Sequence, residues 1–249
     1  MVLKMSGIVK RFAGLLALDH VDFEVADSEV MALVGDNGAG KSTLIKTISG
    51  AHIPDEGEIR IQGELVRFRS PQDTWEKGIA TIYQELALAG KMTVVDNVFL
   101  GREIKRPRFG IPFLDLPAMR KRTSELLNRL DVHVPSIDSW VESMSGGQRQ
   151  GIAIARALNM DARLIVMDEP TAALAVTEAR KVLDFIMRLR EQDKSVVFIS
   201  HNIRDVFEVS NRISVMRHGR CIAVRETRNT TPQEIIGLIT GAHEVRALA

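Results

Sequence analysis

The chain has 249 residues, of which 45% are apolar and 26% are charged, the balance of a soluble globular protein. Its 33 Lys and Arg residues against 32 Asp and Glu give a net charge of +1, which excludes a global basic field for nucleic acid or an anionic membrane. A single cysteine, Cys221, excludes an internal disulfide and fits a reducing compartment. The apolar runs are far shorter than the roughly 18 residues that a membrane-spanning helix needs, so the chain is expected not to cross a membrane by itself.

The first ninety residues predict short strands around one glycine-rich turn. Apolar residues alternate over 20–25, and a nearly continuous apolar run over 29–34 indicates a strand covered on both faces. A helix is expected from Ser42, and two further strands are expected at 58–61 and 79–84.

Residues 89 to about 160 are expected to form a mainly helical insert, because they contain few β-branched runs. Thr93 and Asp96 have the spacing of a capping box, which marks a helix start. Asp115 followed by Pro117 marks another, and apolar residues then recur at helical spacing up to Leu130.

Strands and helices alternate again after residue 160. Strands are expected at 163–168 and 195–200, with an amphipathic helix between them that carries Val182, Phe185, Ile186 and Leu189 on one face. Two further strands, 212–217 and 220–225, flank His218 and Gly219, which together indicate a hairpin. The pattern predicts an α/β fold with a mostly parallel sheet and a second, antiparallel sheet from the N-terminal strands.

The motif GDNGAGKS at 35–42 follows a predicted strand and precedes a predicted helix, which is the context of a phosphate-binding loop. Gly38 and Gly40 allow the backbone to turn with its N–H groups facing a phosphate, and the helix N-terminus adds its dipole. Lys41 supplies a positive charge for the β- and γ-phosphates, and Ser42 supplies a hydroxyl for Mg²⁺. The motif alone indicates a nucleotide.

The segment LIVMDEP at 164–170 is a buried strand that ends in two adjacent carboxylates, Asp168 and Glu169. Beside a phosphate-binding loop, one carboxylate can hold the Mg²⁺ shell while the other polarises an attacking water. A solvated acidic turn is the alternative, which the preceding phosphate loop disfavours.

The segment MSGGQRQG at 144–151 predicts a second helix N-terminus able to bind an anion. Ser145, Gly146 and Gly147 precede the helix, and Gln148 lies in its first turn. By itself this pattern is equally that of an ordinary N-cap with two loose glycines.

The order of these segments, with YQE at 83–85 between them and SH at 200–201 after them, resembles the nucleotide-binding subunit of ABC transporters over residues 3 to about 240. The resemblance implies a P-loop NTPase core with a mostly parallel sheet, an N-terminal antiparallel β subdomain and a helical subdomain at about 89–160, all within one nucleotide-binding domain, 1–249. The segment 83–103 and the text EPTAAL resemble the branch that serves monosaccharide importers of the fructose and ribose type.

The resemblance also implies roles for individual residues. Gln84 corresponds to the glutamine that reaches the metal and the γ-phosphate, and His201 to the histidine that contacts the γ-phosphate, although a lone histidine is more often part of a core. Phe12 corresponds to the aromatic residue that stacks on adenine, with a plain core phenylalanine as the alternative. Catalysis is thereby assigned to Glu169, His201, Gln84 and Lys41, and the metal to Ser42, Gln84 and Asp168. The residues assigned to ATP are Phe12, Gly35, Asp36, Asn37, Gly38, Ala39, Gly40, Lys41, Ser42, Thr43, Ser145, Gly146, Gly147 and Gln148.

In this family two subunits pack head to tail, and each ATP lies between Lys41 of one and Ser145 of the other. The implied partners are therefore a second copy or a similar domain, an integral membrane permease and, indirectly, a sugar-binding protein, with no nucleic acid. The implied location is peripheral, at the cytoplasmic face of the inner membrane. Another cargo, such as an amino acid or a nucleoside, and a soluble ABC ATPase outside transport remain alternatives. A binding module without catalysis is disfavoured because Lys41, Asp168, Glu169 and His201 are all present. Ala175 departs from the family pattern, because an aspartate normally occupies that position in a loop through which the two sites communicate.

Overall fold

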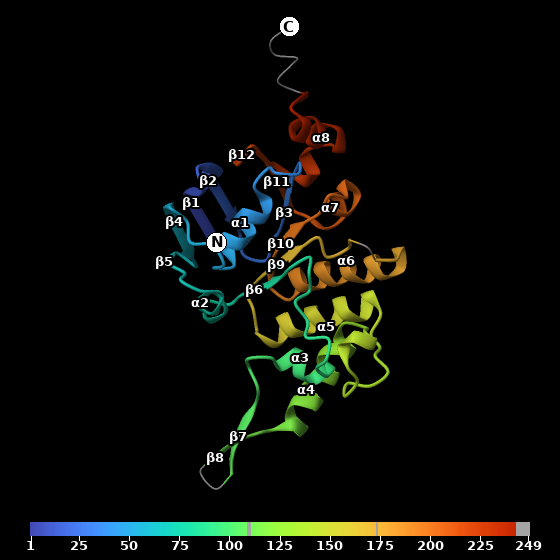
Figure 1. Cartoon of the computed structure of the whole chain (residues 1–249). Helices are drawn as coiled ribbons and strands as arrows, with labels where there is room; N and C mark the ends of the chain where they lie inside the picture. The colour runs from blue at the N-terminus through green and yellow to red at the C-terminus, as the bar shows by residue number, and fades with distance from the viewer. Residues whose placement is uncertain (109–110, 173, 243–249) are drawn as a thin grey trace.

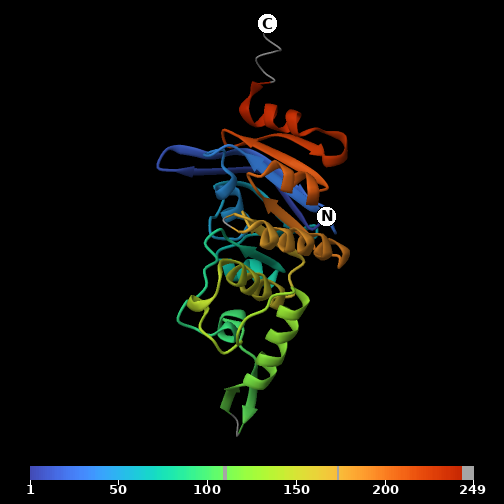
Figure 2. The same ribbon diagram turned by 90° about the vertical axis from the view of Figure 1, so that its right-hand side faces the viewer.

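In the computed structural model, which describes residues 1–108, 111–172 and 174–242, the chain forms an elongated molecule (Figure 1). The two β-sheets and the C-terminal helix lie toward one end, and a helical region with a projecting hairpin forms the other end. A view turned by 90° shows the same arrangement, with the hairpin at the tip farthest from the C-terminus (Figure 2).

The central sheet has six strands, and all but the edge strand β12 run parallel. Across the sheet the order is β12 (Arg220–Glu226), β11 (Arg212–Arg217), β3 (Val30–Gly35), β10 (Ser195–Ile199), β9 (Leu164–Asp168) and β6 (Ile79–Ile82). The carboxyl ends of β3, β9 and β10 are neighbours, so the residues that follow these three strands meet at one edge.

The second sheet is antiparallel, as the alternating N-terminal strands predict. Its order is β2 (Leu15–Val25), β1 (Leu3–Phe12), β4 (Glu56–Ile61) and β5 (Glu64–Val66). Strand β1 is not evident from the sequence pattern, because several irregularities interrupt its pairing with β2 and Gly7 has a positive φ of 60°.

The central strands are apolar on both faces because each face contributes to a separate core. Val30, Ala32 and Val34 of β3 pack with the helical region, whereas Met31 and Leu33 pack against α1 and the antiparallel sheet. Period-two alternation along a strand produces this division, and it explains the continuous apolar run.

Three helices begin at the capping residues that the sequence predicts, and the helix expected from Ser42 begins one residue earlier, at Lys41. Thr93 and Asp96 form a capping box at the start of α3, Asp115 accepts a hydrogen bond from the Ala118 amide at the start of α4, and Ser145 forms a capping box with Gln148 at the start of α5. The helices are α1 (Lys41–Ile48), α2 (Pro71–Glu76), α3 (Val94–Phe99), α4 (Leu116–Arg129), α5 (Gly146–Asn159), α6 (Val176–Glu191), α7 (Ile203–Val209) and α8 (Pro232–Thr240), with 3₁₀ turns η1 (Val141–Ser143) and η2 (Thr227–Asn229).

The region predicted as a helical insert also contains a two-stranded hairpin. Strands β7 (Lys105–Arg108) and β8 (Ile111–Leu114) pair with each other and with no other described strand. Each strand has four residues and contains a proline, so neither gives the alternating pattern from which a strand is predicted.

Candidate nucleotide site

The phosphate-binding loop lies between β3 and α1, and backbone geometry requires its glycines. Gly40 has a φ of 102° and Gly38 a φ of 78°, in the left-handed region that glycine adopts without strain. A Cβ at Gly35 would lie 2.3 Å from the carbonyl oxygen of Met216 in β11, so a side chain cannot be accommodated there without moving the strand. The glycines of the motif GDNGAGKS therefore allow the turn between β3 and α1 that the sequence predicts.

Lys41 is almost fully buried, and its ammonium group is held by the loop itself. Its Nζ atom donates hydrogen bonds to the carbonyl oxygens of Gly35, at 2.8 Å, and Asp36, at 2.9 Å. Burial lowers the pKa of this ammonium, while the carboxylates of Glu169, Asp36 and Asp168 act in the opposite direction. The loop thus holds a desolvated positive charge among carboxylates beside the helix N-terminus.

The two adjacent carboxylates at the end of β9 have different surroundings. Burial, together with the neighbouring Glu169 carboxylate, raises the pKa of Asp168, and Lys41 and His201 partly offset the rise. The Oε1 atom of Glu169 lies 2.8 Å from Nε2 of His201, the second residue after β10. The amide of Glu169 donates a hydrogen bond to the carbonyl of Ile199 at 3.0 Å, and the φ of Glu169 is +51°, a sparsely populated conformation for a non-glycine residue.

A cleft of about 630 Å³ brings most of the predicted nucleotide residues together. Gly35 is buried beneath the loop and Asp36 is exposed beside it, so neither lines the cleft. The predicted residues that line it are Phe12, Asn37, Gly38, Ala39, Gly40, Lys41, Ser42, Thr43, Gln84, Asp168, Glu169 and His201.

Phe12 stands at one wall of this cleft and is 38% exposed, which disfavours a plain core role. Its ring packs edge-on against His52 at 5.0 Å, and Nζ of Lys10 lies 5.5 Å from the ring centre. Leu15 and Leu16, at the start of β2, also line the cleft and are exposed. An aromatic face with aliphatic neighbours offers a planar base apolar surface to cover.

Mg²⁺ is compatible with the donors on the cleft wall. Ser42 offers a hydroxyl, Gln84 an amide oxygen and Asp168 a carboxylate, all of them hard oxygen ligands. The described residues contain no cluster of three or more His, Cys, Asp or Glu that could hold a metal alone. This donor set suits Mg²⁺, which commonly uses one or two carboxylates and completes its shell with substrate phosphates and water.

The segment after Gln84 is fastened to the helical region by two side chains that the sequence analysis did not single out. Arg156 of α5 donates hydrogen bonds of 2.8 Å to the carbonyl oxygens of Leu86 and Ala87. Asn97, which is fully buried, bonds to both the amide and the carbonyl of Ala89. The chain just after Gln84 is therefore tied to α5 through Arg156 and to α3 through Asn97.

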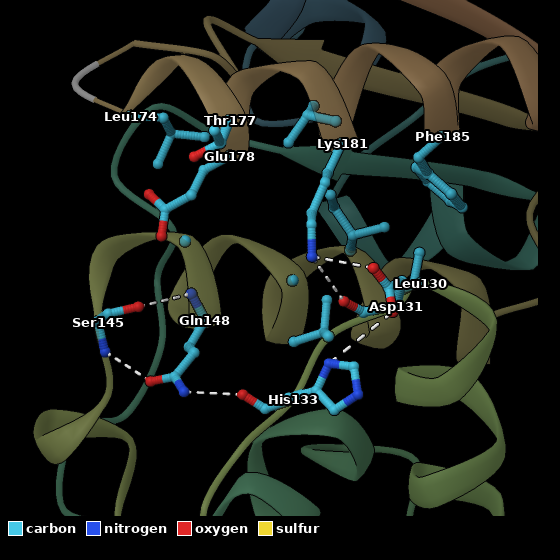
Figure 3. Close-up of a pocket in the computed structure, with 15 residues that line it drawn as sticks. Leu130, Asp131, His133, Ser145, Gln148, Leu174, Thr177, Glu178, Lys181 and Phe185 are labelled. Carbon is cyan, nitrogen blue, oxygen red and sulfur yellow. Dashed lines mark hydrogen bonds and ion pairs between the residues drawn. The ribbon is translucent and has the colours of Figure 1, made fainter.

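Ser145, Gly147 and Gln148 lie at a different cavity, of about 320 Å³, between α5 and α6 (Figure 3). The Ser145 hydroxyl accepts a hydrogen bond from the Gln148 amide at 3.2 Å, and the Gln148 side chain accepts from the Ser145 amide at 2.9 Å. Gln148 Nε2 also donates to the carbonyl of His133 at 2.8 Å. These bonds fix the start of α5.

Two residues of α6 face this helix start, one turn apart. The Glu178 carboxylate lies so close to Gly147 that a Cβ there would be 2.4 Å from its Oε1 atom. Lys181 donates a 2.9 Å hydrogen bond to Asp131, and Figure 3 shows both α6 side chains directed toward α5 and the adjoining loop. Sequence reasoning missed Glu178, since it lies 31 positions beyond Gly147 and only the fold brings the two together.

The two phosphate-binding elements of one chain thus lie at separate cavities. Lys41, Asp168 and His201 line the first, whereas Ser145 and Gly147 line the second, and no residue of the start of α5 lines the first cavity. At the loop before α6, Ala175 occupies the N-cap position and provides no side-chain hydrogen bond to the helix. The aspartate that the family pattern has at this position is a residue type that N-caps helices well, because its carboxylate can accept a hydrogen bond from a first-turn amide.

A parallel sheet with a phosphate-binding loop after one strand, paired carboxylates after another and a histidine after the strand between them defines a P-loop ATPase. Residues 18–172 match the model of the ABC transporter family, so the chain belongs to that family, as the resemblance predicts. None of the helices described in residues 1–108, 111–172 and 174–242 is long and apolar enough to span a membrane.

The chain is similar over nearly its whole length to importer subunits. It is 46% identical over 247 residues to the fructose import ATP-binding protein FrcA of Rhizobium meliloti, covering 98% of this chain and 95% of that protein. It is 44% identical over 239 residues to the xylose/arabinose import ATP-binding protein XylG of Sulfolobus acidocaldarius, covering 96% and 94%. Among solved structures, the dimeric post-hydrolysis state of the ATP-binding cassette MJ0796 bound to ADP and Pi superposes with a TM-score of 0.78 at 25% identity, covering 92% and 100%. The predicted fold class is confirmed by this likeness.

Proposed function

We propose that this chain hydrolyses Mg-ATP to drive sugar uptake through a separate membrane permease. The separation of its two phosphate-binding elements supports this proposal most strongly: the P-loop cleft and the start of α5 lie at different cavities, so each needs a complement from another chain. A head-to-tail pair supplies it, with ATP between Lys41 of one copy and Ser145 of the other. The names of FrcA and XylG support a sugar as the cargo.

In the proposed site the chain's own residues divide the work. The amides of residues 36–42 and the Lys41 ammonium bind phosphates, and Phe12 covers the adenine. Mg²⁺, held by Ser42, Asp168 and Gln84, would neutralise charge on the β- and γ-phosphates. Glu169 accepts a proton from the attacking water. His201, whose Nε2 lies 2.8 Å from the Glu169 carboxylate, orients that carboxylate and contacts the γ-phosphate.

The start of α5 completes the partner's site. The Ser145 hydroxyl and the free amides of Gly146 and Gly147 would donate to the γ-phosphate, and the helix dipole favours that anion. Closing the pair excludes water around the transferred group, and loss of the γ-phosphate removes the link between the two chains. Gln84, whose segment Arg156 fastens to α5, reports this change to the permease.

The proposed location is the cytoplasmic face of the membrane, where the chain is peripheral and contacts the permease. A sugar-binding protein on the other side would deliver the cargo to that permease. The ATPase itself would then never touch the sugar, so an amino-acid or nucleoside cargo is distinguished by assaying the assembled transporter.

A mixed-dimer experiment tests the shared site. Lys41→Ala and Ser145→Arg each damage both sites of their own homodimer, but a mixed pair has one site with both residues intact. Random pairing makes half of the dimers mixed, so about a quarter of the wild-type ATP hydrolysis is expected on mixing. Ser143→Arg adds the same bulk and charge two residues earlier, outside the helix start, and should leave hydrolysis near the wild-type level. No recovery in mixtures shown to contain mixed dimers would contradict the proposal.

A further inference from the structure

The positive charge of the chain is concentrated in one segment, although the chain as a whole is nearly neutral. Residues 102–122 contain seven Lys and Arg and two Asp and Glu, a net charge of +5, whereas the whole chain carries +1 and the remainder therefore carries −4. This segment comprises hairpin β7–β8 and the first half of α4. Arg120 forms an ion pair with Asp138 and Arg122 with Glu125, both outside this segment, so the local basic field comes mainly from the hairpin.

The two acidic residues of this segment are used locally. Glu103 accepts a hydrogen bond from the Gly101 amide at 3.0 Å, and Asp115 caps α4 through the Ala118 amide at 3.2 Å. Lys105 and Arg106 are exposed, and neither forms an ion pair with any residue that the structure describes. Lys105 acts on the Glu103 carboxylate only without a direct contact, so both cations have room for an external anion.

The same segment exposes large apolar side chains. Phe113 is 49% exposed and Leu114 is 47% exposed, on a strand that pairs with β7 and with no other described strand. Exposed apolar side chains next to free cations mark a surface that is covered in use. The others in the segment are Ile104 and Leu116.

The pairing of the hairpin distributes both kinds of side chain over both of its faces. Lys105 pairs with Leu114 and Arg106 pairs with Phe113, and residues paired across two antiparallel strands point to the same face. These two pairs therefore place one cation and one large apolar side chain on each face. Figures 1 and 2 show the hairpin projecting from the body, so both faces are accessible.

We propose that hairpin β7–β8 and the start of α4 form a surface that binds anionic lipid headgroups. A protein groove would cover one face of the hairpin and leave the other face's apolar side chain in water. A headgroup layer surrounds both faces, neutralises Lys105 and Arg106 and receives Phe113 and Leu114 at the acyl boundary. The inference rests on the proposed function because that function brings the chain to a membrane.

Sedimentation of the purified full chain with vesicles tests the surface. Vesicles of phosphatidylcholine alone are compared with vesicles that contain three parts in ten of phosphatidylserine, at low ionic strength. We expect binding to the anionic vesicles that weakens as salt is raised, and little binding to the neutral ones. Equal binding to both, or binding that salt does not change, would overturn the inference.

Charge reversal locates the binding surface. At about 5-fold per cation, reversing both charges in Lys105→Glu/Arg106→Glu should lower vesicle affinity by at least about 25-fold. Arg67→Glu/Arg69→Glu makes the same charge change at two exposed residues after β5 and should alter affinity by less than about 3-fold. Similar losses in both double variants would overturn the inference, because net charge alone would then explain binding.

The apolar contribution has a separate test. Phe113→Ser/Leu114→Ser should weaken binding to anionic vesicles while preserving its salt dependence, and normal ATP binding verifies the fold of each variant. If this hairpin is instead needed for copurification with a membrane protein and has no effect on vesicle binding, it docks a protein and the inference is wrong. Vesicle binding without ATP hydrolysis would refute the proposed function alone.

Discussion

Glu169→Gln is the most informative single substitution, because it removes a base and little else. Glutamine keeps the length of the side chain and an oxygen that can still accept from Nε2 of His201, 2.8 Å away in the unmodified chain. The strained backbone at this position, with φ at +51° and its amide bonded to Ile199, does not depend on the carboxylate. Phosphate binding through the Lys41 loop is likewise retained.

The expected loss follows from the proton-transfer step. A positioned general base contributes about 10²–10⁴-fold, so turnover at saturating Mg-ATP should fall by at least about 100-fold, or about 2.7 kcal/mol in activation free energy. ATP binding should remain within about 3-fold, because no ground-state contact to phosphate is lost. ATP-bound dimers should persist, since the step that releases them is blocked.

Phosphate release measures turnover, and light scattering after size exclusion measures the dimer. Glu208→Gln is the matched control, because Glu208 lies near His201 around a neighbouring cavity and is bonded to Arg180 rather than to the site. It should keep wild-type turnover. Near-normal turnover in Glu169→Gln, with ATP binding intact, would refute the assignment of Glu169 as the base.

Three further changes follow from the same geometry. Gly35→Ala should lower the free energy of unfolding by more than about 3 kcal/mol in urea titrations, because the new Cβ would lie 2.3 Å from the Met216 carbonyl oxygen. Gly38→Ala should lower it by only about 1–2 kcal/mol of backbone strain, because no atom lies within 4 Å of its Cβ position. Equal losses in the two variants would contradict this reading of the loop. Ala175→Asp should raise the free energy of unfolding by about 0.5–2 kcal/mol by capping α6, and no gain would show that the N-cap is already satisfied. Because burial raises the pKa of Asp168, Asp168→Asn should stabilise the nucleotide-free chain at neutral pH while weakening Mg-ATP binding. This gain in the free energy of unfolding should shrink as pH falls, because the wild-type carboxyl then takes up a proton. A gain that does not change with pH would contradict burial of the charged carboxylate as its cause.

Local signals in the sequence predicted much of the fold. The capping residues placed the starts of α3, α4 and α5, and His218 with Gly219 forms the two-residue turn between β11 and β12, both with positive φ as such turns require. The phosphate loop and the carboxylates at the end of β9 share one cleft, as the motif context predicts.

Long-range contacts could not be predicted in the same way. The hydrogen bond from Arg156 to Leu86 spans 70 positions, and the approach of Glu178 to Gly147 depends on how α5 and α6 pack. The hairpin β7–β8 was missed because its strands are short and contain prolines. Leu15 and Leu16 were missed at the cleft because exposed leucines at a strand start carry no chemical signal of their own.

The central claim is that ATP hydrolysis in this chain is coupled to sugar transport through a separate permease. The most direct test starts by purifying the tagged chain from membranes together with any integral membrane protein that accompanies it. ATP hydrolysis is then measured in proteoliposomes with a sugar-binding protein, in the presence and absence of fructose, ribose, xylose or arabinose. We expect an accompanying permease and stimulation by one of these sugars, with no stimulation in the Glu169→Gln variant. Hydrolysis that no sugar changes, in a chain that purifies without any integral membrane protein, would contradict the central claim.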